Sequence, residues 1–172
     1  MRTFCTAVIL SFSLFAFAQT DNSKIIKIRE AVEHINKDSG YIIKKLDADK
    51  FMEETTDNGA ELTAYFKNNE LVKIVEWVGL SSCISVTEYY LKNNKLIFTY
   101  TKGSEHPYSD SLQTLDYNKL VMTMECRFYF ENDKLIKSIL KGSTHCAGEA
   151  TVEFAEEDVK EYLRYKKLLL NK

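Results

Sequence analysis

Apolar positions recur at two different spacings along this chain, and each spacing predicts a different kind of element. In the segment from about 24 to 36 the apolar residues are three or four positions apart, which is typical of an amphipathic helix. They are Ile25, Ile28, Val32 and Ile35. A second helical pattern covers about 156–170, where acidic residues begin the segment and Lys166 and Lys167 lie near its end, as the helix dipole favours. Between these two helices, apolar and polar positions alternate in the manner of strands.

One short unit occurs three times in the middle of the chain. It consists of an aromatic residue, a further apolar residue, a charged residue, a pair of turn residues, another charged residue and Leu. The copies are Tyr65-Phe66-Lys67-Asn68-Asn69-Glu70-Leu71, Tyr90-Leu91-Lys92-Asn93-Asn94-Lys95-Leu96 and Tyr129-Phe130-Glu131-Asn132-Asp133-Lys134-Leu135. The paired Asn or Asp residues tolerate the left-handed backbone angles of a two-residue type I′ turn, so each copy predicts a β-hairpin. Cross-strand pairs should then be Phe66 with Leu71, Leu91 with Leu96, and Phe130 with Leu135.

Together these patterns predict an α+β fold, an antiparallel β-meander of hairpins with an N-terminal helix and a C-terminal helix packed on it. Strands are expected near 41–46, 60–67, 70–78, 83–92, 95–101, 121–131 and 134–141, with a further short one within 149–154. In 121–131 the even positions are apolar and the odd ones include Glu125 and Arg127, so one face should be buried, with Cys126 pointing inward. We expect both helices to cover this apolar face. The alternative places the C-terminal helix outside, as an element that binds a partner.

The first residues predict export. Arg2 precedes an apolar run from Ala7 to Phe17, and the small-residue pattern Ala16-Phe17-Ala18 follows, which is typical of a secretory signal peptide covering residues 1–18. The run is too short to cross a bilayer as a helix, which argues against a membrane anchor. No second run of spanning length follows. The sequence therefore predicts a mature domain, 19–172, in the periplasm or outside the cell.

Composition narrows the class of protein further. The chain has 172 residues, of which 45% are hydrophobic and 28% charged, with one Pro and six Gly, so collagen-like, low-complexity and disordered classes are excluded. The formal net charge is -2, and no long run of Lys and Arg occurs. We therefore expect one globular domain that does not bind nucleic acid.

Export makes the cysteines candidates for oxidation. The predicted mature chain keeps Cys83, Cys126 and Cys146, an odd number. In a meander, Cys83 and Cys146 fall at the sheet end opposite the hairpin turns, whereas Cys126 lies in the middle of a strand. The preferred disulfide is therefore Cys83–Cys146, with a reduced pair or another pairing left open, and Cys126 is expected to be a buried thiol.

The hairpin unit resembles that of small exported proteins, uncharacterised, from Bacteroidetes-type bacteria, in which a helix precedes a meander of such hairpins. The similarity covers residues 24–141, and the unit also distantly resembles MORN-type repeats. What the resemblance implies is the fold and the location. It carries over no catalytic residue.

The longest irregular segment, 102–113, is the best candidate for a binding loop. It contains His106, Tyr108 and Asp110. Ser104, His106 and Asp110 are also the residue types of a hydrolase triad, although a triad is defined by geometry. A second cluster joins His145 and Cys146 with Cys126 and Glu149, as a cysteine nucleophile with its base or as a metal site. Its spacing does not match zinc ligands, so neither metal nor cofactor is predicted.

The leading functional hypothesis is an exported, non-catalytic binding module. Tyr65, Tyr89 and Tyr129 would present rigid amphipathic surface on an exposed sheet face to an envelope protein or glycan. The alternative is a small secreted hydrolase or metal-dependent enzyme that uses a loop histidine, either His106 with Asp110 or His145 with Cys146. The sequence predicts no oligomeric state.

Overall fold

A computed structural model describes the backbone of residues 14–170 and the side chains of residues 22–170. Most of the predicted leader, 1–18, therefore lies outside the described residues. The elements follow one another along the chain as α1 (Leu14–Lys37), β1 (Ile42–Asp47), α2 (Ala48–Phe51), β2 (Ala60–Lys67), β3 (Glu70–Gly79), β4 (Cys83–Lys92), β5 (Lys95–Glu105), β6 (Tyr108–Ser109), β7 (Thr114–Leu115), β8 (Val121–Glu131), β9 (Lys134–Thr144), β10 (Gly148–Glu149) and α3 (Phe154–Leu170).

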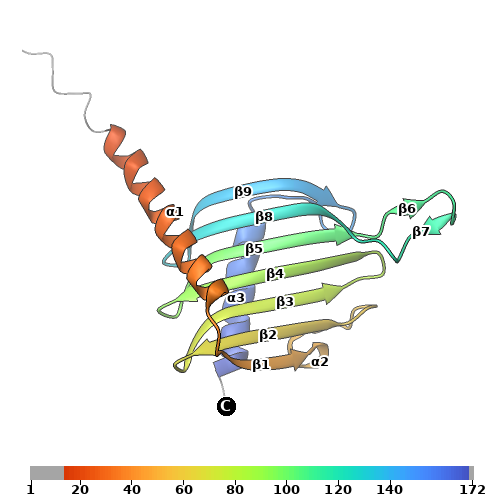
Figure 1. Ribbon diagram of the computed structural model, residues 1–172, viewed down its shortest axis with the longest axis horizontal. Helices are drawn as coiled ribbons and strands as arrows, with labels where there is room; N and C mark the ends of the chain where they lie inside the picture. The colour runs from red at the N-terminus through yellow and green to blue at the C-terminus, as the bar shows by residue number, and fades with distance from the viewer. Residues whose placement is uncertain (1–13, 171–172) are drawn as a thin grey trace, which may run out of the picture.

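The strands form the predicted antiparallel meander. Eight of them make one sheet in the order β1-β2-β3-β4-β5-β8-β9-β10, and β6 and β7 form a separate small hairpin that projects from its end (Figure 1). The fold class expected from the sequence is thus confirmed.

The three hairpins turn as the Asn and Asp pairs predict. Both residues of each turn have positive φ angles, between 51° and 64°. The cross-strand pairs at the turns, Phe66 with Leu71, Leu91 with Leu96 and Phe130 with Leu135, are also confirmed. In each hairpin the register then shifts directly after this pair, so one residue of the returning strand bulges out of the ladder.

One face of the sheet, the α3 face, carries the larger core. Cys126, Phe128 and Phe130 of β8 pack there with α3 residues such as Tyr162 and Tyr165, and all five side chains are at most 1% exposed. The Tyr162 hydroxyl also donates a hydrogen bond to the backbone carbonyl of Asn94, at 2.9 Å, which ties α3 to the β4–β5 turn. The C-terminal helix therefore packs on the sheet.

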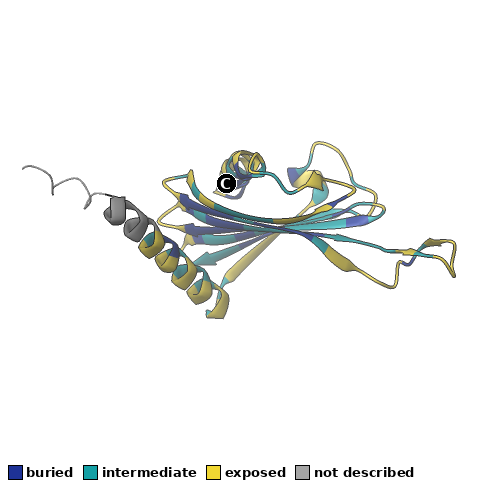
Figure 2. Cartoon of the chain, turned by 90° about the horizontal axis from the view of Figure 1, so that it is seen from above, coloured by how far each residue is buried: buried dark blue, intermediate teal, exposed yellow. Residues whose placement is uncertain are grey.

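The opposite face, the α1 face, carries a smaller core. Ile25 of α1 packs there on Tyr90, Phe98 and Tyr129, which lie close to the hairpin turns. The expectation that both helices cover one face is therefore wrong: they lie on opposite faces (Figure 2). The alternating pattern concealed this, because the strands carry aromatic residues on both faces near the turns.

Several boundaries differ from those expected. β5 continues to Glu105, so the segment predicted to be irregular is strand at its start. α1 begins at Leu14 rather than at about residue 24, and β9 continues to Thr144. Within the described part of the chain, no helix is both long and apolar enough to cross a membrane.

Candidate functional site

Helix α1 covers only part of its face of the sheet (Figure 2). The strand register places aromatic, apolar and charged residues on the uncovered part. Residues that pair directly across neighbouring strands lie on the same face. The register thus produces rows that cross the sheet. The row beneath α1 contains Tyr90, Phe98 and Tyr129, the next contains Glu88, Tyr100, Arg127 and Ile139, and the outermost contains Trp77, Val86, Lys102 and Glu125.

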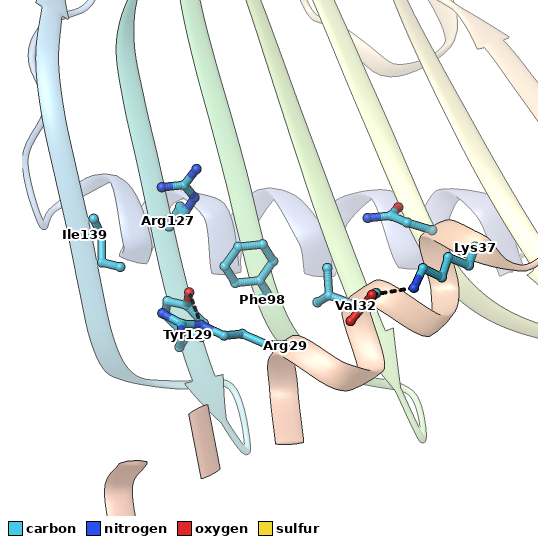
Figure 3. A pocket seen from close by; sticks show the side chains of 9 residues that line it. Arg29, Val32, Lys37, Phe98, Arg127, Tyr129 and Ile139 are labelled. Carbon is cyan, nitrogen blue, oxygen red and sulfur yellow. Dashed lines mark hydrogen bonds and ion pairs between the residues drawn. The ribbon is translucent and has the colours of Figure 1, made fainter. Parts of the chain in front are cut away.

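A groove of about 530 Å³ lies where α1 passes over the first two of these rows. Figure 3 shows its side chains extending from α1 on one side and from β5, β8 and β9 on the other. The groove is lined by Arg29, Val32, Glu33, Asn36, Lys37, Phe98, Arg127, Tyr129 and Ile139. Its volume lies within the range of sites that bind small ligands.

The floor of the groove is rigid and aromatic. The rings of Phe98 and Tyr129 lie 4.9 Å apart between centroids, and both side chains are buried. Arg29 of α1 lies over the Tyr129 ring, with 5.7 Å from its guanidinium carbon to the ring centroid, and its Nε donates a hydrogen bond to the Tyr129 hydroxyl at 3.2 Å. The floor therefore holds one cation in place.

The three cations of the groove differ in how they are neutralised. Lys37 pairs with Glu33 at 2.5 Å, and Arg127 pairs with Glu125. Arg29 forms no ion pair within the described part of the chain, and its side chain is exposed. An uncompensated guanidinium beside apolar side chains is suited to bind an anionic group that carries an apolar body.

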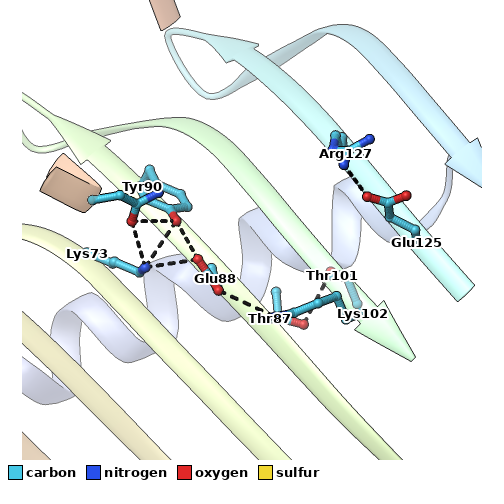
Figure 4. Close-up of polar contacts among 9 residues, drawn as sticks. Lys73, Thr87, Glu88, Tyr90, Thr101, Lys102, Glu125 and Arg127 are labelled. Atoms are coloured by element: carbon cyan, nitrogen blue, oxygen red, sulfur yellow. Dashed lines mark hydrogen bonds and ion pairs between the residues drawn. The ribbon is translucent and has the colours of Figure 1, made fainter. Parts of the chain in front are cut away.

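A polar network holds the end of α1 next to this groove (Figure 4). Lys73 Nζ lies 2.9 Å from a carboxylate oxygen of Glu88 and donates a hydrogen bond to Asn36 Oδ1 of α1 at 3.0 Å. The hydroxyl of Tyr90 donates to Glu88. Burial by itself raises the pKa of Glu88, but the hydrogen bonds from Tyr90 and Lys73 outweigh it and hold this pKa below its ordinary value. Glu88 is therefore a fixed anion that orders the surrounding donors.

Of the three tyrosines expected on an exposed face, only Tyr65 is accessible, being half-buried on the α1 face. Tyr89 is 1% exposed and Tyr129 is 3% exposed. The prediction that these two side chains are exposed is wrong, because each face carries a helix: α3 covers Tyr89 and α1 covers Tyr129.

The predicted binding loop contains His106, Tyr108 and Asp110, around the β6–β7 hairpin. Tyr108 is 60% exposed. A ring nitrogen of His106 lies 2.6 Å from the backbone carbonyl of Lys119, and the imidazole is 5.0 Å from the ring of Tyr117 between centroids. His106 thus supports the hairpin, and among the described residues no hydrogen bond joins it to Ser104 or Asp110.

The preferred disulfide is confirmed. Cys83 and Cys146 are bonded, with Cα atoms 6.4 Å apart, and Cys126 is a buried free thiol. Cys126 therefore does not join His145 in a cluster. The group that does form consists of Cys83, His145 and Cys146, and two of its three members are already bonded to each other as a disulfide. His145 instead contacts Ser82 and Glu105, two residues that the sequence alone did not single out.

The chain is thus an α+β protein in which an antiparallel meander lies between two helices, with a groove beside α1. No protein-family model, curated protein or solved structure matches this chain.

Proposed function

We propose that this chain is exported and acts as a binding module, and that the groove between α1 and the sheet is a non-catalytic binding site. The observation that carries this proposal is Arg29, an exposed cation without an ion-pair partner in the described residues, held over a buried aromatic floor. Among the residues that the structure describes, no Ser, Cys or His lines the groove. It therefore favours binding over nucleophilic chemistry.

The lining also indicates the chemistry of the partner. Val32, Phe98 and Ile139 supply apolar contact, whereas Arg29 supplies positive charge. A glycan offers few apolar groups to such a lining. An envelope protein segment that ends in apolar residues and a carboxylate would satisfy both parts of the groove.

Export is supported by two observations. The N-terminal residues match a signal peptide. The Cys83–Cys146 disulfide is of a kind that persists in oxidising compartments. Removal of residues 1–18 would leave in the mature chain every described residue that lines the groove, since Arg29 is the first of these.

The test compares two peptides that differ only at one end. Acetyl-Leu-Leu with a free carboxylate and acetyl-Leu-Leu-amide are titrated into the isotope-labelled mature chain, and amide chemical shifts are followed by NMR. We expect the acid to bind with a dissociation constant of about 0.1 to 1 mM. Its shifts should cluster at Arg29, Phe98 and Tyr129, and the amide should bind several-fold more weakly.

The matched variants are Arg29→Gln and Lys27→Gln, which remove one positive charge each from the same helix. Lys27 does not line the groove. Arg29→Gln should weaken binding of the acid about 3- to 10-fold without changing binding of the amide, and Lys27→Gln should change neither. Equal affinity for acid and amide would refute the proposal. Tighter binding of glucuronate than of the peptide acid would identify a glycan instead.

A further inference from the structure

Three side chains meet at the end of the sheet that lies away from the hairpin turns. Ser82 lies in the turn before β4, Glu105 is the last residue of β5, and His145 begins the turn after β9. The β4–β5 register places Cys83 opposite Glu105, and the backbone N–H of His106 donates to the carbonyl of Ser82 at 3.0 Å. Strand pairing therefore brings the backbones of Ser82 and Glu105 next to each other.

The contacts among the three follow the order nucleophile, base and carboxylate. Ser82 Oγ lies 2.7 Å from His145 Nε2. The other ring nitrogen, Nδ1, lies 2.9 Å from Glu105 Oε1, and the backbone N–H of His145 donates to the same oxygen at 2.5 Å. A carboxylate facing Nδ1 keeps the proton on that nitrogen, so Nε2 accepts the proton of the Ser82 hydroxyl.

The disulfide holds this arrangement together. Cys83 follows Ser82 and Cys146 follows His145, so the bond between the two sulfurs joins the turn of the nucleophile to the turn of the base. Gly103 lets the end of β9 come close, because a Cβ there would lie 2.5 Å from the Thr144 side chain. Three segments distant in sequence are thus fixed to one another.

Accessibility agrees with a reactive site. His145 has a side chain that is 52% exposed, Ser82 is half-buried, and the side chain of Glu105 is 21% exposed. The backbone N–H of Ser82 makes no hydrogen bond within the described part of the chain. Such a free N–H beside the nucleophile can donate to an oxyanion that forms there.

We propose that Ser82, His145 and Glu105 form a second site, a serine nucleophile that accepts acyl groups from exposed carboxylic esters. The Ser82 hydroxyl oxygen bonds to the carbonyl carbon of the ester while its proton moves to His145 Nε2. The bond from carbon to the alcohol oxygen then breaks, and His145 returns the proton to the departing alcohol. Water repeats these steps on the acyl-serine and releases the carboxylic acid.

Glu105 acts as a positioning residue. It contacts His145 rather than the reacting atoms, and it fixes the orientation and the tautomer of the imidazole. Its loss should therefore slow the reaction, and a variant that keeps the carboxylate should restore part of the rate.

The test uses diisopropyl fluorophosphate, whose phosphorus takes the place of the ester carbonyl and whose fluoride is the leaving group. The mature chain is treated with this reagent, digested and examined by mass spectrometry. We expect one adduct, on Ser82. Ser81 is the matched control, since it is the adjacent serine and its hydroxyl bonds to Asp57 instead of a histidine. Ser81→Ala should label as the unmodified chain does, whereas Ser82→Ala should not label.

Further variants separate a triad from a merely exposed serine. His145→Gln should slow labelling of Ser82 about 100-fold or more, the range for loss of a general base. Glu105→Gln should slow it about 10-fold, and Glu105→Asp, which keeps the carboxylate, should recover part of the lost rate. The Cys83→Ala/Cys146→Ala double variant, with its fold checked by circular dichroism, should lose most of the labelling because the two turns are no longer joined.

Three outcomes would overturn the proposal. They are no adduct on Ser82, equal labelling of Ser81 and Ser82, and a rate unchanged in His145→Gln. If the adduct forms as expected, turnover of p-nitrophenyl acetate by the unmodified chain but not by Ser82→Ala completes the assignment, and acylation without release of acetate would restrict the site to a single acyl transfer. None of these measurements depends on the groove at α1, so failure of this proposal leaves the binding proposal untouched.

Discussion

Replacing Asp158 with asparagine removes a buried acid that makes the stability of this fold depend on pH. Asp158 lies on α3 and is 8% exposed. Its carboxylate oxygen accepts a hydrogen bond from the Thr99 hydroxyl of β5 at 2.5 Å. Burial, together with the nearby carboxylates of Glu76 and Glu157, raises the pKa of Asp158 from 3.8 to about 7. The hydrogen bond from Thr99 opposes this rise without cancelling it.

The direction of the pH effect on stability depends on whether the folded or the unfolded chain holds the proton of Asp158. Between about pH 4 and pH 7, the Asp158 carboxyl is protonated in the folded chain and ionised in the unfolded chain, so folding takes up a proton. The stability due to this group is complete below about pH 4 and is lost as pH rises to about 7. A shift of about three pKa units corresponds to about 4 kcal/mol.

Urea unfolding followed by circular dichroism at pH values from 4 to 8 measures this directly. Asp158→Asn should remove the part of the decrease in the free energy of unfolding between pH 4 and pH 7 that Asp158 causes. Glu76, whose pKa burial also raises, should leave a smaller decrease. At pH 8 Asp158→Asn should be more stable than the unmodified chain by up to about 4 kcal/mol. Glu156→Gln, an exposed acid on the same helix that is not among the groups raising the pKa of Asp158, is the control and should keep the decrease. If Asp158→Asn kept the full pH dependence, or were less stable at pH 8, the reasoning would be refuted.

Four further predictions concern two glycines, the buried thiol and the disulfide. Gly142→Ala should lower the free energy of unfolding by about 3 kcal/mol or more, because its φ is 72° and the new Cβ would lie 1.9 Å from the Thr123 carbonyl oxygen. In Gly148→Ala, where φ is 76° and no atom lies within 4 Å, the loss in the same urea titration should be about 1 kcal/mol. The thiol of Cys126 should not react with Ellman's reagent until the chain unfolds, because it is buried and burial raises its pKa to about 11. Reduction of the disulfide, which joins residues 63 positions apart, should lower the free energy of unfolding by about 4 kcal/mol in the same assay.

The hairpins were predictable because their determinants are local. An Asn or Asp pair that accepts positive φ, with apolar residues on either side, fixes both the turn and the first cross-strand pair. The bulge that follows was not predicted. It moves Ile97 and Ile136 out of the ladder pairing, and both pack against the α1 core. A bulge depends on what the extra residue contacts, which the repeated unit by itself does not show.

The placement of the helices was not predictable from the alternation alone. Strand β8 has apolar residues at its even positions, but near the turn Tyr129 is aromatic on the other face as well. A second apolar patch of this kind must be buried against another secondary-structure element. The aromatic residue that begins each hairpin unit was the available signal. We predicted that Tyr129 is exposed, whereas it lies with Tyr90 beneath α1.

The contacts of Ser82 required two long-range constraints at once. The disulfide was predicted, and it places the residues before Cys83 and Cys146 near each other. Glu105 can be placed opposite Cys83 only if β5 continues past residue 101, where we expected it to end. Its register with β4 must also include the one-residue shift at the bulge. Neither step involves a local motif. A search for triad residues within one loop therefore selected His106, whereas the structure joins residues from three turns and strand ends.

The sheet also explains why the two proposed sites can be tested separately. Phe98, at the groove, and Glu105, beside Ser82, lie on the same strand, and a strand rises about 3.3 Å per residue, so they stand roughly 20 Å apart. A small ligand bound at Arg29 cannot reach His145 across that distance. Arg29→Gln should therefore leave the labelling rate of Ser82 unchanged, and Ser82→Ala should leave peptide binding unchanged. Coupling between the two would require the whole strand to move, which the helices packed on both of its faces oppose.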